Sequence, residues 1–160
     1  MRVSKAAPPT GAVRSVPEEL YEQEFEISGG NFSDAGGVST RIKALLKQLG
    51  VDSRIIRRAA IASYEAEMNV VMYAQGGKMK LSVSPREVEI TCEDRGQGIA
   101  NIDLAMQEGY STATEEMREL GFGAGMGLPN IKRNSDLFEI ASQVGVGTKL
   151  RILIRTPEGT

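Results

Sequence analysis

Apolar and polar residues alternate in several segments of the chain, and this alternation predicts strands with one buried face. In the first such segment, Phe25 and Ile27 alternate with Glu24 and Glu26. Later segments repeat the pattern in two pairs, each with turn residues between its members, which predicts two hairpins. The predicted strands span residues 21–28, 78–84, 86–93, 137–143 and 148–155.

Between the first strand and the first hairpin, apolar residues recur every three or four positions, which predicts two helices. Ser33 or Asp34 can cap the first helix. The second helix is longer and extends to about Ala74, after which Gly76 and Gly77 can end it. Shorter helices at residues 102–107 and 128–135 and a loop at residues 108–124 complete the predicted elements.

The order of these elements is strand, two helices, two strands, loop, helix and two strands. It predicts an α+β fold in which helices cover one face of a mainly antiparallel sheet. The chain has 160 residues with 41% hydrophobic and 25% charged content, which is normal for one globular domain. Three prolines and few bulky apolar residues precede Leu20. The predicted regions are a flexible N-terminal extension at 1–19, a folded domain at 20–155 and a C-terminal tail at 156–160.

The net charge of −2 gives the chain no general attraction to nucleic acid or to an anionic membrane, so neither is expected as a partner. No segment approaches the roughly 20 apolar residues of a membrane span. Cys92 is the single cysteine and alternates with apolar residues in a predicted strand, so a buried, reduced thiol is expected. These features predict a soluble, cytoplasmic protein.

Histidine is absent from the chain. The chain therefore cannot form a phosphohistidine intermediate on its own side chains, and it lacks the commonest zinc ligand. This excludes a self-contained sensor histidine kinase.

Glu65 and Asn69 form the first of three segments with candidate chemistry. They are four residues apart. On a helix, such residues lie about 6 Å apart along the axis at nearly the same azimuth, so both can reach one ligand. The Asn69 amide oxygen, with phosphate oxygens, can hold Mg²⁺, and Glu65 can accept a proton from an attacking hydroxyl or water. Taken alone, the pair fits a solvent-exposed helix face better than a binding site. Glu67 points roughly 200° away and is expected to be a solvated charge.

Asp94 begins the second segment, directly after a predicted strand, and Gly96 and Gly98 follow it. A carboxylate there can accept a hydrogen bond from the exocyclic amine of adenine, and glycines let the backbone approach the base. The alternative is an acidic turn between strand and helix, because Asp and Gly are favoured turn residues.

The third segment has glycines at positions 121, 123, 125 and 127 directly before a predicted helix. Exposed glycine amides and the positive end of a helix suit a polyphosphate. The P-loop pattern is absent. A plain glycine linker is the alternative. Lys132 or Arg133 can contact a phosphate, and a solvated position suits either at least as well.

In this order and spacing, the three segments resemble the N box, G1 box and G2 box of the GHKL ATPase superfamily, whose members share the Bergerat ATP-binding fold. The resemblance covers residues 20–155, which it identifies as a GHKL ATP-binding kinase domain. It implies a two-layer sandwich with a mainly antiparallel mixed sheet, ATP and Mg²⁺ as cofactors, and a short ATP lid between the G1 and G2 boxes. The segment Glu65–Asn69 departs from many relatives, which carry apolar residues directly after the Glu.

The resemblance also implies a role for each matching residue. Glu65 matches the catalytic base, Asn69 the magnesium ligand and Asp94 the adenine contact. The other implied nucleotide contacts are Gly96, Gly98, Gly123, Gly125, Gly127, Leu128 and Thr148, with Ser111, Thr112 and Lys132 as candidate phosphate contacts.

Within the superfamily, the chain resembles the small serine/threonine kinases of anti-sigma and stress-response regulation, and residues 125–138 resemble the stressosome switch kinases more than the sporulation anti-sigma kinases. This implies an ATP- and magnesium-dependent kinase of a bacterial partner-switching module. It would phosphorylate STAS-domain proteins and, once released, activate a phosphatase or cyclase-type effector. One alternative is an anti-sigma factor that sequesters a sigma factor and phosphorylates a STAS protein. The other is a nucleotide-binding scaffold with negligible phosphoryl transfer.

Overall fold

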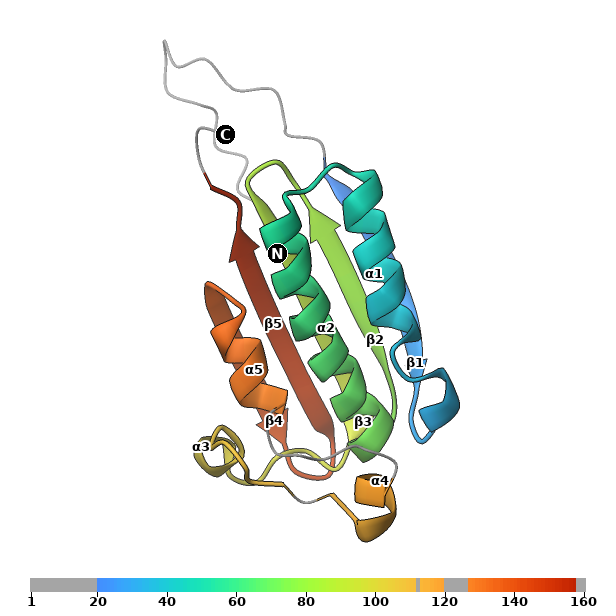
Figure 1. The fold of residues 1–160 in the computed structure, drawn as a ribbon. Helices are drawn as coiled ribbons and strands as arrows, with labels where there is room; N and C mark the ends of the chain where they lie inside the picture. Colours follow the sequence, from blue (N-terminus) through green and yellow to red (C-terminus); the bar gives the residue numbers. More distant parts are fainter. Residues whose placement is uncertain (1–19, 112, 120–126, 158–160) are drawn as a thin grey trace, which may run out of the picture.

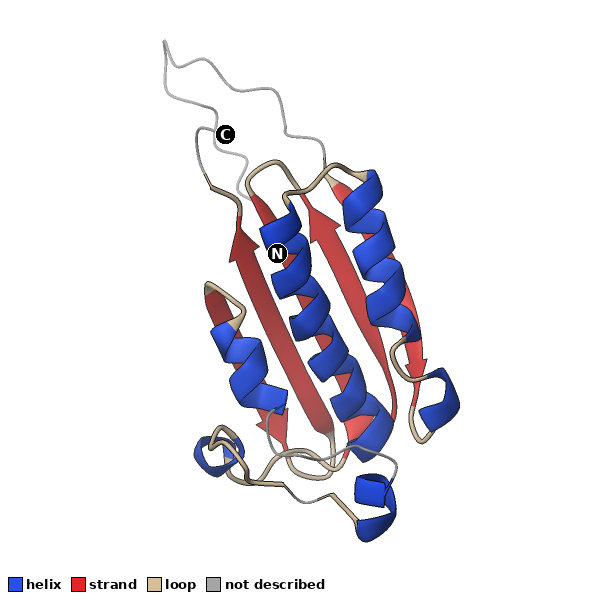
Figure 2. Ribbon diagram, in the orientation of Figure 1, coloured by secondary structure: helices blue, strands red, loops and turns tan. Residues whose placement is uncertain are grey.

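The protein, here a computed structural model, is described at residues 20–111, 113–119 and 127–157, and it forms two layers (Figure 1). Five strands make one open sheet, and helices cover one of its faces (Figure 2). The strands are β1 (Tyr21–Ser28), β2 (Ala74–Val83), β3 (Glu87–Gly96), β4 (Leu137–Gln143) and β5 (Gly147–Arg155). The helices are η1 (Phe32–Asp34), α1 (Gly37–Gln48), α2 (Ser53–Tyr73), α3 (Ile102–Ala105), α4 (Glu115–Glu119) and α5 (Gly127–Arg133).

The strand order in the sheet is β1-β2-β3-β5-β4, and each pairing between these strands is antiparallel. The predicted α+β two-layer fold is thus confirmed. β5 follows β4 in the sequence but lies inside the sheet, between β3 and β4. Helix α2 crosses the middle of the sheet, with α1 on one side and α5 on the other (Figure 1).

The two faces of the sheet differ as the alternation of residues predicts. On the face opposite the helices, charged side chains pair across strands: Lys78 lies 3.7 Å from Glu26, and Lys80 lies 3.5 Å from Glu22. On the helix-covered face, alternate strand residues pack against α1, α2 and α5 and exclude water, which supplies most of the driving force for folding. The fully buried core includes Ile42, Leu46, Ala59, Ala62, Met79, Leu81, Val88, Ile90, Ile131, Ile152 and Ile154.

Several element boundaries differ from the prediction by a few residues, as at β2, which begins at Ala74 rather than Lys78. Gly76 and Gly77 do not end the long helix by forming a turn, because α2 already ends at Tyr73 and both glycines lie in β2. A Cβ on Gly77 would lie 2.9 Å from the Glu93 carbonyl oxygen, so close packing of β2 against β3 requires glycine there. The segment predicted as a loop at 108–124 contains the short helix α4. No helix in the described ranges is both long and apolar enough to cross a membrane.

Glu67 is not a solvated charge; it is 2% exposed and caps the start of α1. Its carboxylate accepts hydrogen bonds from the backbone N–H groups of Gly36 at 3.1 Å, Val38 at 3.1 Å and Ser39 at 2.9 Å. Two residues along an ideal helix correspond to a rotation of roughly 200°, so Glu67 and Glu65 lie on different sides of α2. On the Glu67 side of α2 lies α1 rather than solvent. The predicted cap, Ser33 or Asp34, is therefore wrong: a residue of the neighbouring helix provides the cap.

Candidate functional site

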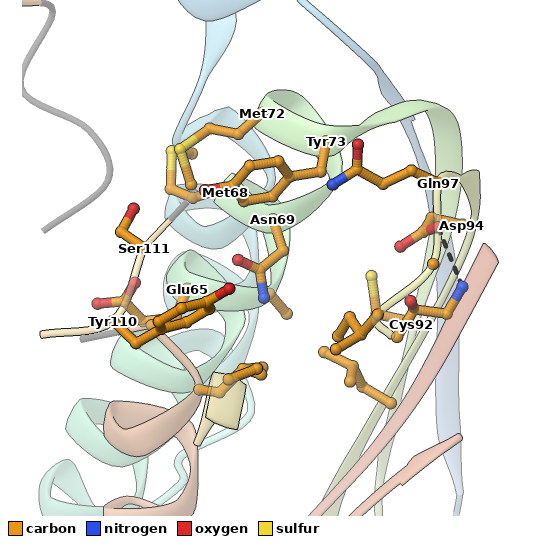
Figure 3. A pocket seen from close by; sticks show the side chains of 18 of the residues that line it. Glu65, Met68, Asn69, Met72, Tyr73, Cys92, Asp94, Gln97, Tyr110 and Ser111 are labelled. Atoms are coloured by element: carbon orange, nitrogen blue, oxygen red, sulfur yellow. Dashed lines mark hydrogen bonds between the residues drawn. The ribbon is translucent and has the colours of Figure 1, made fainter. Parts of the chain in front are cut away.

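A cavity of about 640 Å³ lies beside α2, where β3 ends and β5 begins (Figure 3). Its volume falls in the range of roughly 300–1,000 Å³ that is usual for small-molecule sites. The lining comes from segments far apart in the sequence and includes Glu65, Asn69, Asp94, Gly98, Gly127 and Thr148.

Glu65 and Asn69 line the cavity from α2, four residues apart and therefore on one helix face. The start of α5 lies against both: a Cβ on Gly127 would be 3.5 Å from Glu65 Oε1 and 3.6 Å from Asn69 Oδ1. The side-chain amide of Asn130, also in α5, donates a hydrogen bond of 3.0 Å to Glu65 Oε2. One Glu65 oxygen is thus held by α5, while the other faces the glycine that opens this helix.

Asp94 lies across the cavity from Glu65, with Asn69 between them in Figure 3. Asp94 Oδ1 accepts the backbone N–H of Thr148 at 3.1 Å. Burial raises the pKa of Asp94, and the hydrogen bond from Thr148 opposes that rise. A carboxylate has two acceptor oxygens, so Asp94 can bond Thr148 through Oδ1 and still offer an acceptor to a ligand in the cavity.

A hydrogen-bond network ties the loop after β3 to the β4–β5 turn. Ser142 Oγ accepts the backbone N–H of Ile99 at 2.7 Å and lies 2.8 Å from Thr148 Oγ1 and 3.1 Å from the Gly147 carbonyl oxygen. Gly98 packs on the same turn, where a Cβ would be only 2.3 Å from the Gln143 carbonyl oxygen. This network holds the loop beside Asp94 and Thr148.

The arrangement fits a nucleotide with its metal ion. At one end, the Asn69 amide oxygen is a hard ligand of the kind that Mg²⁺ takes together with phosphate oxygens. At the other end, Asp94 offers an acceptor to an exocyclic amine. Comparison with known proteins decides the family: the histidine kinase-like ATPase domain matches residues 33–154.

The chain belongs to the histidine kinase-like ATPase domain family. This confirms the predicted membership in the GHKL group. Although the family name refers to histidine kinases, this chain contains no histidine.

Relatives of this histidine kinase-like ATPase domain include kinases and anti-sigma factors. The chain is 31% identical to the serine/threonine-protein kinase RsbT of Bacillus subtilis over 111 residues, which cover 67% of this chain and 77% of RsbT. It is 32% identical to an anti-sigma F factor of Clostridium kluyveri over 98 residues, 61% of each chain. It is 30% identical to an anti-sigma F factor of a Thermoanaerobacter species over 118 residues, which cover 71% of this chain and 79% of that protein.

The structure of this ATPase domain brings most of the predicted site residues into one cavity. Leu128 and Ser111 join the lining already described. Gly96 does not line the cavity; it pairs with Ala74 at the end of β3. Lys132 is exposed on α5, away from the cavity lining. Thr112, Gly123 and Gly125 lie outside the described residues.

Ser142 and Asn130 are site residues that the sequence did not indicate. Ser142 lies 43 residues from Ile99, its hydrogen-bond partner, and Asn130 lies 65 residues from Glu65. Each is a polar residue in an otherwise ordinary strand or helix, so no local pattern distinguishes it. Apart from Leu128, the apolar part of the lining, including Met68, Met72 and Leu150, was also not predicted as part of the site.

Proposed function

We propose that the chain is an ATP- and magnesium-dependent serine/threonine protein kinase of a bacterial stress-signalling partner-switching module. One observation carries the proposal: Glu65 and Asn69 share a face of α2, and Gly127 lies against both. A base and a magnesium ligand therefore flank the position that phosphates would take. The relationship to RsbT, whose name states serine/threonine kinase activity, supports this function.

Each residue has a separate task in this mechanism. Asp94 accepts a hydrogen bond from the adenine amine, and Thr148 keeps the Asp94 carboxylate in place. Asn69 would hold a magnesium ion, which would reduce the negative charge of the phosphates. The partner's hydroxyl oxygen attacks the γ-phosphorus as Glu65 accepts the hydroxyl proton, and the bond to the β-phosphate oxygen breaks to release ADP.

The proposed substrates are Ser or Thr residues of STAS-domain proteins in a stressosome-like complex. After release from this complex, the kinase would act on a downstream phosphatase or cyclase-type effector in the cytoplasm. The absence of histidine supports transfer to a hydroxyl on another protein, because the chain offers no imidazole of its own.

A second candidate is an anti-sigma factor that sequesters a sigma factor and phosphorylates a STAS protein. It is favoured by the matches to anti-sigma F factors at 30–32% identity. Co-purification with a sigma factor, together with loss of transcription in vitro, would support this candidate over the switch kinase.

Labelled ATP and candidate STAS-domain proteins provide the direct test. We expect the label to appear on Ser or Thr of a partner in the presence of Mg²⁺. If ATP binds normally and no partner acquires label, the protein is a nucleotide-binding scaffold and the kinase proposal is wrong.

Two variants separate the proposed roles of Glu65 and Asn69. Asn69→Ala is expected to abolish magnesium-dependent ATP binding, since it removes the metal's protein ligand. Glu65→Gln is expected to leave ATP binding unchanged but to slow transfer by about 100-fold or more, the usual contribution of a general base. Glu26→Gln, on β1, is the control and should change neither quantity. Equal loss of ATP binding in both site variants would contradict the assigned roles.

A further inference from the structure

Asn130 and Arg133 form a chain of side-chain contacts with the proposed base. Asn130 Nδ2 donates to Glu65 Oε2 at 3.0 Å, and an Arg133 guanidinium nitrogen donates to Asn130 Oδ1 at 3.1 Å. Arg133 also pairs with Glu108, three residues beyond the end of α3. The chain of contacts therefore links α2, α5 and the segment between α3 and α4. We infer that Asn130 is a positioning residue for Glu65 and that Arg133 fixes the orientation of Asn130; this rests on the proposed function.

The chemistry of the three side chains permits one orientation of the Asn130 amide. A carboxylate only accepts hydrogen bonds and a guanidinium only donates them. The NH₂ end of Asn130 must therefore face Glu65, and the oxygen end must face Arg133. The reverse orientation would place oxygen against oxygen and N–H against N–H. Arg133 thus specifies which end of Asn130 meets the base.

A neutral amide suits this position better than a charged group. An arginine in direct contact with Glu65 would pair its full charge with the carboxylate and make it a weaker base. Asn130 instead engages one oxygen and leaves Oε1 beside Gly127, next to the proposed phosphate position. Correct placement of a reacting group contributes strongly to rate, because misplacement by about 1 Å can cost roughly 100-fold.

The packing of α5 does not depend on this amide. Leu128, Pro129 and Ile131 are buried and hold the helix on the core. Asn130 and Arg133 are three residues apart and thus neighbours on the helix surface. Removing the Asn130 side chain should therefore leave α5 docked while freeing the Glu65 carboxylate to rotate.

The test compares Asn130→Ala with Asn134→Ala. The Asn134 amide, just after α5, donates to the Asn130 backbone carbonyl at 2.8 Å, so its removal leaves the contact between the Asn130 side chain and Glu65 in place. For Asn130→Ala we expect an ATP dissociation constant and ATP KM within about twofold of wild type and a kcat lower by about tenfold. Arg133→Gln should lower kcat less. Added to Glu65→Gln, the Asn130→Ala change should lower kcat no further, because the base that it positions is already absent. A further multiplicative loss, or an equal loss in Asn134→Ala, would overturn the inference.

Nuclear magnetic resonance of the side-chain amides tests the contact without phosphoryl transfer. The Asn130 NH₂ signals should shift in Glu65→Gln, whereas those of Asn134 should not. If the Asn130 signals do not respond, the inference is wrong, whatever the activity of the wild type. If they respond and the wild type labels no partner, the positioning contact stands and the proposed kinase function fails.

Discussion

Position 98 requires glycine for two reasons: its backbone conformation and the lack of room for a side chain. Its φ is +75°, in the left-handed region, and a Cβ would lie 2.3 Å from the Gln143 carbonyl oxygen. Gly50, at the end of α1, has the same φ of +75° but nothing within 4 Å of a Cβ. Substitutions at these two positions can therefore distinguish the cost of backbone strain from the cost of steric crowding.

The substitution Gly98→Ala should be more damaging than Gly50→Ala. Gly50→Ala should lower the free energy of unfolding by about 1–2 kcal/mol, the usual cost of a left-handed alanine. Gly98→Ala should cost more, and it should also weaken ATP binding because the loop beside Asp94 must move. Urea denaturation and calorimetry would measure the two effects. Equal effects in both variants would show that crowding against Gln143 is unimportant.

The substitution Asp94→Asn tests the proposed hydrogen bond between this carboxylate and adenine. The substitution replaces one acceptor oxygen with an NH₂ donor, so one of the two hydrogen bonds is lost, because a donor then faces a donor. We expect ATP affinity to fall by roughly tenfold, equivalent to about 1.4 kcal/mol. Glu93→Gln is the control, because Glu93 is the exposed neighbour in β3 and does not line the cavity. Unchanged affinity of Asp94→Asn in calorimetry would count against the assignment.

At the scale of elements, Glu67 joins two helices by capping one from the other. A carboxylate at a helix N-terminus also interacts favourably with the helix dipole. Glu67→Ala would leave the N–H groups of Gly36, Val38 and Ser39 without this acceptor. We expect a loss of about 3 kcal/mol in unfolding free energy, since each unsatisfied buried donor costs about 1–3 kcal/mol.

Hydrogen exchange would locate the effect of Glu67→Ala, with faster exchange expected at Val38 and Ser39. Glu24→Ala, on the outer face of β1, removes an exposed glutamate and should cost less than about 1 kcal/mol. A Glu67→Ala protein as stable as Glu24→Ala would show that the cap contributes little.

Asp136 connects α2 to the β4–β5 hairpin and makes stability depend on pH. Burial opposes ionisation, but the backbone N–H of Arg155 and the Arg58 guanidinium together lower the pKa of Asp136 below its usual 3.8. A lowered folded-state pKa means that the stabilisation is complete above the unfolded-state pKa and disappears as pH falls through the folded-state pKa.

Asp136→Asn should therefore lower the free energy of unfolding by roughly 1 kcal/mol at pH 7, a value typical of a partly exposed charged pair. The difference from wild type should vanish at strongly acidic pH, where Asp136 is protonated. Asp103→Asn, an exposed aspartate in α3, is the control. A difference that persists unchanged at low pH would exclude the charge of Asp136 as its cause.

The elements that the sequence predicted well are those with a strong local pattern. The alternation at 21–28 and 137–143 predicted the observed bounds of β1 and β4, because in each strand more covered residues alternate with exposed ones. The motif spacing likewise identified Glu65, Asn69 and Asp94, which the structure places in one cavity.

The features that were missed depend on neighbours that are distant in sequence. Gly76 and Gly77 suggested a helix end by their type, but the close approach of β3 places them in a strand. The position of Glu67 on α2 predicted a surface charge, because nothing in the local sequence indicates that α1 packs beside it. Asn130 and Ser142 required the packing of α5 on α2 and of the β4–β5 turn on the loop after β3.

At the scale of the whole molecule, the reactivity of the Cys92 thiol can be used to follow unfolding of the two-layer domain. The thiol is 2% exposed, and burial, with nearby negative charges of Asp94 and Glu67, raises its pKa from 9.0 to about 12. Such a pKa leaves only about a thousandth of the usual thiolate near neutral pH, and the thiolate is the reactive form.

Native protein should therefore react with an aromatic disulfide reagent far more slowly than urea-unfolded protein, and the rate should follow unfolding. The absorbance of the aromatic thiolate released from the reagent measures the reaction rate. Cys92→Ser combined with Thr40→Cys, on the exposed side of α1, provides a rapidly reacting control. Cys92 also lines the cavity, so rapid labelling in native buffer would mean that the reagent reaches the thiol through the cavity without unfolding.

The position of β5 inside the sheet has a consequence for synthesis. β5 is the last strand along the described chain, yet it lies between β3 and β4, and it contributes Thr148 to the cavity. A nascent chain that has left the ribosome only as far as β4 has an open β3 edge and no partner for the Asp94 carboxylate. Translation must therefore pass β5 before the cavity can close, so the cavity forms only after nearly the whole domain has been synthesised.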